Sequence, residues 1–328
     1  MIPAPDLVDR FRRDLQSLIA SDARLGIAVS GGPDSIALLL LAAAARPGQV
    51  EAATVDHALR EGSVAEAEQV ARLCEDLGVP HRILTVRWDE KPHSAIQERA
   101  RGARYALLGK WMEERRLAAL ATAHHVEDQA ETFLMRLARG AGVRGLAAMR
   151  AAAVVPETDL PLLRPLLGWR RAELEAICVE AEVEPAADPS NADEQFERVR
   201  VRRALGEADW LDPQAIARSA AALGAAEAAL DWAVAQVWKA DVTAGPDQVV
   251  FRPEGLPPEI LRRLVERALV LLKTEGTNVD LRGRELDPLL ETLRSGGRAT
   301  LRGVLCTGGE EWRFVPAPNR TRRVTYGC

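Results

Sequence analysis

Cysteine is scarce in this chain, and no two cysteines stand close together. The four copies are Cys74, Cys178, Cys306 and Cys328. Zinc ribbons, cysteine-ligated iron–sulfur clusters and disulfide frameworks need clustered or regularly spaced cysteines, so we expect none of these. The thiols are predicted to be small buried or incidental side chains in a reducing compartment.

Long apolar runs are missing as well. No segment approaches the roughly 18 uninterrupted apolar residues of a membrane span. Residues 1–6 carry neither the basic nor the apolar region of a signal peptide. We therefore expect a cytoplasmic protein with no membrane partner. With 328 residues, the chain is long enough for two domains and a sizeable core.

Lysine is nearly absent, so arginine carries almost all of the positive charge. Only four of the 43 basic residues are lysines, and the formal net charge is −5. A negative total argues against nucleic-acid binding by the chain as a whole, but the arginines gather at residues 198–203 and again after residue 298. Arginine binds phosphate in a fork and stacks on bases, although arginine-rich composition can also reflect coding bias alone.

The first half of the chain alternates short apolar runs with helical segments. This pattern is typical of a parallel sheet covered by helices on both faces. The expected strands are residues 26–29, 50–55, 82–86 and 118–121, and the expected helices are residues 7–19, 35–45, 63–77 and 94–114. We predict an α/β domain at residues 1–208.

After residue 213 the composition becomes rich in alanine, and a different domain is expected. We predict a long helix at residues 213–239, a strand at 249–251, a helix at 258–272 and a hairpin of two strands within 298–315. The predicted architecture is therefore the parallel α/β domain followed by a smaller α+β domain at residues 209–328.

A glycine-rich turn follows the first expected strand. It consists of Ser30, Gly31, Gly32, Pro33, Asp34 and Ser35. Two adjacent glycines let the backbone turn tightly, so that successive N–H groups converge on phosphate oxygens at the positive end of a helix. No lysine follows as in a Walker loop, whereas Asp34 is suited to hold Mg²⁺ against phosphates. The turn is predicted to bind pyrophosphate; an ordinary turn between strand and helix is the alternative.

Polar residues also follow the fourth expected strand. His124 and His125 lie at its end, and Asp128 and Glu131 share one face of the helix that begins there. Ligands of an open parallel sheet bind beyond the carboxyl ends of its strands, where the glycine-rich turn and His57 are also expected. One composite site is predicted, with the acidic pair directed at Mg²⁺ or an attacking ammonium group. The alternatives are helix-terminal charge for the acids and a polar strand end for the histidines.

Together these segments resemble the tRNA(Ile)-lysidine synthetase family, within the PP-loop ATP pyrophosphatase superfamily. The matching stretches are residues 30–35, 55–60, 101–105, 123–132, 140–146, 163–167 and 188–191. Residues 257–263 and 295–301 are similar to the first C-terminal domain of the family. The resemblance implies a PP-loop catalytic domain, which is Rossmann-like and similar to adenine nucleotide α-hydrolases, followed by a C-terminal tRNA-binding domain.

The resemblance implies an ATP-dependent ligase of tRNA modification. ATP would adenylate the C2 oxygen of the wobble cytidine in a CAU anticodon, and the ε-amine of L-lysine would then displace AMP. The products would be lysidine, AMP and pyrophosphate, and the codon specificity of tRNA(Ile) would change from AUG to AUA. The implied cofactors are ATP and Mg²⁺, the implied partners are tRNA(Ile) and L-lysine, and a homodimer is left open.

The resemblance also implies roles for single residues. The expected catalytic residues are Asp34, Arg104, His124, Asp128 and Glu131. The expected ATP-binding residues are the six of the glycine-rich turn and His57, and Mg²⁺ is expected on Asp34 and Asp128. Arg104 would stabilise the reacting phosphate, His57 and His124 would shape the nucleotide pocket or bind the α-phosphate, and the acidic pair would hold metal or accept protons from lysine.

Contacts with tRNA are expected from Arg198, Arg200, Arg202, Arg322 and Arg323. The family often has Arg-Asn-x-x-Arg in this region, whereas Val199 stands here in place of the asparagine, so one polar contact is lost. The chain also ends without the second C-terminal domain of longer members. We therefore expect the arginine-rich end to take part in tRNA binding.

Two other functions are weighed against this one. A tRNA 2-thiocytidine synthetase shares the pyrophosphate loop and a similar His-His-Asp-Glu segment, but its sulfur transfer relies on clustered cysteines, which this chain lacks. An ATP-binding regulatory module whose catalysis has decayed is the second alternative. The intact Asp34, Asp128 and Glu131 count against it.

Overall fold

The computed structural model describes residues 2–59, 62–88, 96–186, 197–273 and 283–318. The chain divides into two compact units, Met1–Gly224 and Ala225–Cys328. The expected domain boundary between residues 208 and 209 stays a prediction. Among the described residues, no helix is long and apolar enough to cross a membrane.

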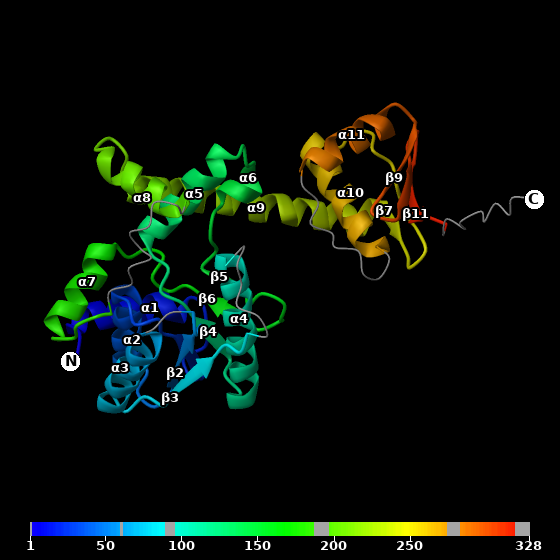
Figure 1. The fold of residues 1–328 in the computed structure, drawn as a ribbon. Helices are drawn as coiled ribbons and strands as arrows, with labels where there is room; N and C mark the ends of the chain where they lie inside the picture. Colours follow the sequence, from blue (N-terminus) through cyan, green and yellow to red (C-terminus); the bar gives the residue numbers. More distant parts are fainter. Residues whose placement is uncertain (1, 60–61, 89–95, 187–196, 274–282, 319–328) are drawn as a thin grey trace, which may run out of the picture. The chain divides into compact units, whose positions relative to one another are not determined.

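A six-stranded sheet forms the centre of the first unit (Figure 1). Its strands are β1 (Leu25–Ala28), β2 (Val50–Asp56), β3 (His81–Thr85), β4 (Ala119–Ala121), β5 (Ala152–Val154) and β6 (Pro161–Leu163). Their order is β3-β2-β1-β4-β6-β5, and every pair is parallel except β5 with β6. The predicted parallel α/β class is confirmed, and the antiparallel edge strand is an addition to it.

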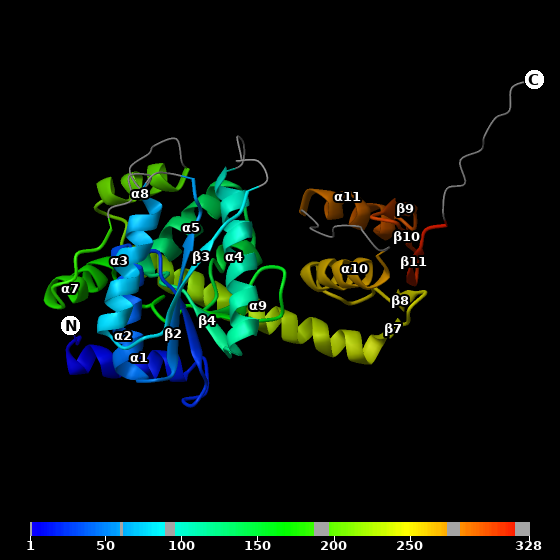
Figure 2. The same cartoon turned by 60° about the horizontal axis from the view of Figure 1, so that its bottom comes forward.

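Helices cover both faces of this sheet (Figure 2). The helices on its faces are α1 (Pro5–Gln16), α2 (Pro33–Ala45), α3 (Ser63–Asp76), α4 (Ile96–Arg115) and α7 (Arg171–Glu180). The first unit also contains α5 (Val126–Ala138), α6 (Val143–Leu146) and α8 (Glu197–Glu207). One core cluster joins α1, α2, α3 and α7 to one face and includes Phe11 and Leu39. A second cluster, with Trp111 and Met112, joins α4 to the other face. Each such side chain stabilises the fold by about 1.5–3 kcal/mol when buried.

The helix α2 is buried along most of its length. Residues 36–42 are all apolar and at most 3% exposed. A helix that is apolar on every side must be covered on every side, and α1 and α7 pack against it in addition to the sheet. The start of α2, which carries the glycine-rich turn, is therefore fixed in position relative to the strands.

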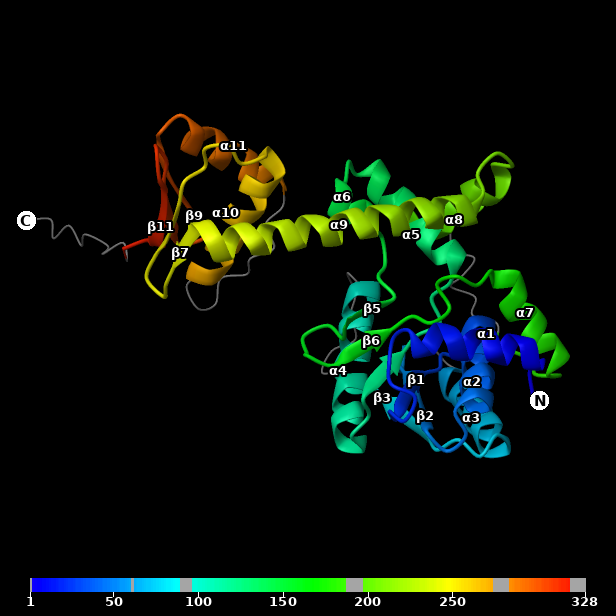
Figure 3. The same ribbon diagram turned by 180° about the vertical axis from the view of Figure 1, so that it is seen from behind.

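The second unit contains a five-stranded antiparallel sheet (Figure 3). Its strands are β7 (Val242–Ala244), β8 (Val249–Phe251), β9 (Arg298–Leu301), β10 (Val304–Thr307) and β11 (Trp312–Pro316), and its helices are the end of α9 (Pro213–Asp241), α10 (Pro258–Leu272) and α11 (Gly283–Arg294). The predicted hairpin within residues 298–315 is confirmed, because β10 pairs antiparallel with β11 across Gly308 and Gly309, but the third strand β9, which pairs with β10, was not predicted. Arg302 and Gly303 both adopt positive φ and form a tight turn that the sequence pattern did not indicate.

A buried arginine joins two helices of the second unit. Arg263 on α10 is 4% exposed. Its guanidinium donates to Glu227 at 2.6 and 2.9 Å, to Asp231 at 2.7 Å and to Glu259 at 2.9 Å. Because acceptors surround it, the buried charge is compensated, and its hydrogen bonds to Glu227 raise its pKa above the ordinary value.

Candidate active site

The glycine-rich turn connects β1 to α2 at the carboxyl edge of the sheet. Gly31 has a φ of +89°, a left-handed conformation that favours glycine. Ser35 holds the turn together: its Oγ accepts from the backbone N–H of Ser30 at 3.1 Å and donates to the carbonyl of Gly32 at 2.9 Å. The turn therefore presents its backbone at the N-terminus of α2, where an anion is favoured.

Asp34, in the first turn of α2, has two differently placed oxygens. Oδ2 lies 3.5 Å from Nε2 of His125. Oδ1 is buried and has no hydrogen-bond partner among the described residues. A buried carboxylate oxygen without a donor is unfavourable, so this atom is suited to a cation that arrives with the ligand.

His125 connects Asp34 to the start of α5. Its Nε2 lies 3.5 Å from Oδ2 of both Asp34 and Asp128, and its Nδ1 lies 2.8 Å from Oε2 of Glu127. Burial opposes protonation, but the three carboxylates outweigh burial and raise the pKa of His125 to about 10. The ring is therefore an imidazolium at neutral pH and brings the two expected metal ligands together.

No separate role was predicted for His125 from the sequence. The signal that could have found it is its place directly before a helix with acidic residues in the first turn, since Glu127 and Asp128 both lie within reach. Glu127 was not predicted as a site residue either, although it lies in the first turn of the same helix. Its Oε2 also accepts from the backbone N–H of Arg171 at 3.0 Å, which ties the start of α7 to the site.

Asp128 caps the first turn of α5 and faces charged groups. Its Oδ2 accepts from the backbone N–H of His125 at 3.1 Å, and its Oδ1 accepts from Arg198 at 3.0 Å. Burial works against ionisation, but the charges of His125 and Arg198 outweigh it and lower the pKa of Asp128. Asp128 is therefore an anion at neutral pH.

Glu131 lies one turn further along α5 and is 1% exposed. Its Oε1 accepts from Nε of Arg202 at 2.6 Å, and its Oε2 accepts from Nε of Arg198 at 2.7 Å. These two arginines of α8 were expected to contact tRNA, which stays a prediction; here they bind the acidic pair. Arg200 is exposed on the same helix.

His124 is neutral, in contrast to its neighbour. Its Nδ1 lies 2.9 Å from Oγ1 of Thr122. Burial lowers its pKa to about 4; the charges of Arg164, Arg198 and Arg101 add to this effect, and Asp128 opposes it. A neutral imidazole in this place can hydrogen-bond to a phosphate oxygen without adding charge.

His57 follows β2 directly, at the same edge of the sheet. Its Nδ1 is buried without a partner among the described residues, and its carbonyl accepts from Nε1 of Trp88 at 2.7 Å. Burial lowers the pKa of His57, the charge of Arg104 lowers it further, and Asp56 opposes both. Arg104, which is exposed on α4, is thus within electrostatic reach of His57.

Three buried side-chain atoms of the described residues lack a hydrogen-bond partner. They are Oδ1 of Asp34, Nδ1 of His57 and Nε of Arg164. Because these residues follow β1, β2 and β6, all three atoms belong to the carboxyl edge of one sheet. A carboxylate oxygen that can bind a cation and an arginine N–H that can donate to an anion fit a nucleotide bound with Mg²⁺.

The two expected metal ligands are compatible with Mg²⁺ in number as well as in kind. Within the described residues, no group of three or more histidine, cysteine, aspartate or glutamate side chains could hold a metal ion. Mg²⁺ in nucleotide sites usually takes one or two carboxylates together with phosphates and waters. Asp34 and Asp128 meet that requirement.

Comparison with known proteins places the chain in a family. Residues 7–208 match the family model of the PP-loop domain. The tRNA(Ile)-lysidine synthase of Novosphingobium aromaticivorans is 49% identical over 94% of this chain and 93% of that protein. The chain belongs to the tRNA(Ile)-lysidine synthase family. Another member, from Zymomonas mobilis, is 42% identical over 96% of this chain and 95% of its own length.

Membership of the lysidine synthase family confirms the predicted family, the ATP-binding PP-loop domain and the prediction of a ligase. A solved structure of the U34-tRNA thiolase NcsA from Methanococcus maripaludis, with its [4Fe-4S] cluster, is similar to this chain with a TM-score of 0.55. It is 15% identical and covers 66% of this chain and 77% of that chain. This likeness shows a shared fold.

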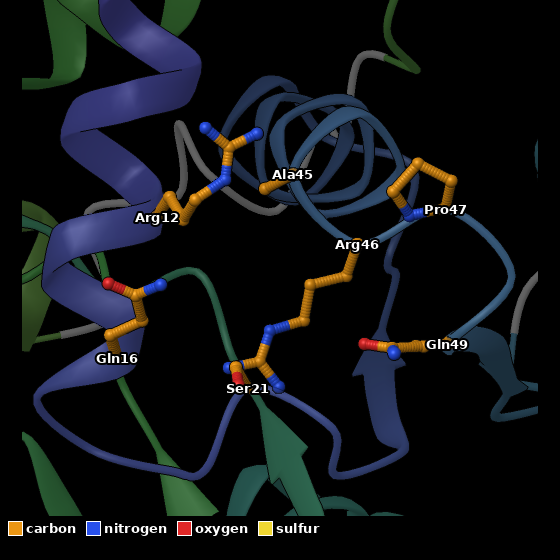
Figure 4. A pocket seen from close by; sticks show the side chains of 7 residues that line it. All are labelled: Arg12, Gln16, Ser21, Ala45, Arg46, Pro47 and Gln49. Carbon is orange, nitrogen blue, oxygen red and sulfur yellow. The ribbon is translucent and has the colours of Figure 1, made fainter.

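Two expected tRNA contacts fall outside the described residues, and one pocket lies away from the site. Arg322 and Arg323 fall outside the described residues, so their expected tRNA contacts stay predictions. A pocket of about 250 Å³ lies near the end of α2 and the start of β2, at the opposite edge of the sheet (Figure 4). Its lining is Arg12, Gln16, Ser21, Ala45, Arg46, Pro47 and Gln49. None of these is an expected site residue.

Proposed function

We propose that this lysidine synthase family member ligates L-lysine to the wobble cytidine of tRNA(Ile) with a CAU anticodon, at the expense of ATP. The names of its relatives support the RNA substrate. The observation that carries the proposal is that the glycine-rich turn, Asp34 and Asp128 meet at one edge of the sheet. The product, lysidine, would change the codon specificity from AUG to AUA.

In the first step, the C2 oxygen of the cytidine attacks the α-phosphorus of ATP, and the bond to the pyrophosphate oxygen breaks. The backbone of the glycine-rich turn would bind the departing phosphates. Arg104 and the neutral His124 would hydrogen-bond to the oxygens on the reacting phosphorus, where negative charge develops. Mg²⁺, held by Asp34 and Asp128, would neutralise charge on the leaving group when bound.

In the second step, the ε-amine of lysine attacks C2, and AMP leaves with the C2 oxygen. The ammonium group must lose a proton to water before it can attack. Asp128 would attract the ammonium group through its negative charge. It is not assigned to remove the proton, because its lowered pKa makes it a weak base. Glu131 contributes through Arg198 and Arg202, which it holds against α5.

Labelled lysine and purified protein test the proposal. With ATP and Mg²⁺, lysine should be incorporated and pyrophosphate released only when RNA with the CAU anticodon is present. The two CAU tRNAs, for isoleucine and methionine, should be offered as competitors, and tRNA(Ile) should be modified in preference. Sulfur incorporation, or pyrophosphate release that needs no RNA, would contradict the proposal.

A further inference from the structure

Three arginines of the described residues are more than nine-tenths buried, and one of them is incompletely bonded. Arg46, Arg164 and Arg263 are 5%, 8% and 4% exposed. Arg263 is surrounded by carboxylates, and Arg46 donates to three backbone carbonyls. Arg164 donates from Nη1 to the carbonyl of Arg150 at 2.7 Å, but its Nε has no partner among the described residues.

The position of Arg164 fixes the direction of its unpaired edge. It follows β6, and its backbone N–H donates to the carbonyl of Ala151 at 2.8 Å. The hydrogen bond from Nη1 to the carbonyl of Arg150 orients the guanidinium group. The edge that carries Nε is left without a partner for Nε among the described residues. This edge, with Nε–H beside an Nη–H, matches two oxygens of one oxyanion.

The surroundings of Arg164 are positively charged. Arg101 on α4 lowers the pKa of both Arg164 and His124, and Arg164 also lowers that of His124, so the three groups lie within electrostatic reach of one another. Arg101 itself lies 4.9 Å from the ring centre of Tyr105. Within the described residues, no carboxylate forms an ion pair with Arg101 or Arg164. Two guanidinium groups within electrostatic reach of a neutral imidazole favour phosphate over a single carboxylate.

We propose that Arg164 and Arg101 form a second phosphate-binding site, which holds a backbone phosphate of the RNA beside the reacting cytidine. This inference rests on the proposed function. In the sheet, β6 is separated from β1 by β4, so it lies two strand spacings, roughly 9–10 Å, from the strand that carries the glycine-rich turn. That separation favours a phosphate other than those held by the turn. The α-phosphate of ATP is the other source of the same chemistry.

Binding measurements on the full chain test this site. Arg164→Lys keeps the charge and removes the fork, and Arg46→Lys is the matched control, a buried arginine with carbonyl acceptors on both Nη groups. We expect Arg164→Lys to raise the Kd for a CAU anticodon stem-loop about 10-fold and to leave the Kd for ATP within about 2-fold. Arg101→Gln should reduce the salt slope of RNA binding by about 0.7, the value for one phosphate of a single strand.

The outcomes separate the two phosphate sources. If Arg164→Lys raises the Kd for ATP and leaves RNA binding unchanged, Arg164 binds a phosphate of the nucleotide, and the proposal of an RNA phosphate is overturned. Unchanged binding of both ligands, or a rise in the KM for lysine alone, would overturn the site. If Arg164→Lys unfolds at a lower temperature than Arg46→Lys, the salt slope of RNA binding by Arg101→Gln decides between the outcomes, because Arg101 is exposed and its replacement should not disturb the fold. Wild-type protein that modifies no CAU tRNA would refute the proposed function, whereas an active wild type with unaffected variants would refute only this inference.

Discussion

Replacing Glu131 by glutamine should weaken the attachment of α8 to α5. Both oxygens of Glu131 accept from guanidinium groups, and its side chain is 1% exposed. Breaking a fully buried ion pair costs about 3–5 kcal/mol. The guanidinium groups of Arg198 and Arg202 are 41% and 35% exposed, so water can compensate them in part. We therefore expect a loss of roughly 1–3 kcal/mol in the free energy of unfolding of the first unit.

The matched control lies on the same pair of helices. Glu197 on α8 forms an ion pair with Arg139 at the end of α5, but these side chains are 37% and 63% exposed. An exposed pair of this kind contributes about 0–1 kcal/mol. Glu197→Gln should thus be nearly neutral, although it also removes one charge from the link between α5 and α8.

Scanning calorimetry of the full chain measures both variants. In a unit of about this size, 1 kcal/mol corresponds to a shift of roughly 2–4 °C in Tm. We expect the first-unit transition of Glu131→Gln to fall by roughly 2–12 °C and that of Glu197→Gln to move by less than about 4 °C. Equal Tm values for the two variants would refute the reasoning, because the buried clamp would then be worth no more than a surface pair.

Two further predictions concern titration. His125 keeps its proton up to a pKa of about 10 in the fold, against about 6.5 in the unfolded chain, so its stabilisation is complete below pH 6.5 and is lost as the pH rises toward 10. Urea unfolding in EDTA should show a smaller decline over that range in His125→Gln, and equal declines would contradict the assignment. Burial raises the pKa of Cys74 and Cys306 to about 12 and that of Cys178 to about 11. In a Cys328→Ser variant at pH 8, iodoacetamide should label these thiols only after unfolding, and rapid labelling of the native protein would argue against their burial.

Local patterns made much of the first unit predictable. The glycine-rich turn is a short segment whose conformation depends on its own residues, as the positive φ of Gly31 illustrates. The four parallel strands that the alternating pattern predicted are all present, each within a few residues. The strands β5 and β6 have only three residues each and were missed, whereas the equally short β4 was predicted because it continues the alternation of strands and helices.

The contacts between distant segments were not predictable from the sequence. Glu131 and Arg198 are 67 positions apart, and only the packing of α8 on α5 brings them together. Which of two adjacent histidines becomes charged depends on where each ring points, and the sequence does not determine that. Arg164 lies in a stretch that resembles the family, but no role was predicted for it, since its unpaired Nε exists only in the folded chain.

The transfer of labelled lysine to CAU-anticodon tRNA by Asp34→Asn tests the central claim most directly. Asp34 is 31% exposed and its Oδ1 has no partner among the described residues, so the substitution should leave the fold intact. Asp76→Asn, an exposed aspartate at the end of α3, is the control. We predict that Asp34→Asn transfers lysine at least roughly 100-fold more slowly than the wild type, while Asp76→Asn matches it. Equal rates for Asp34→Asn and the wild type would contradict the claim that the carboxyl edge of this sheet carries the reaction.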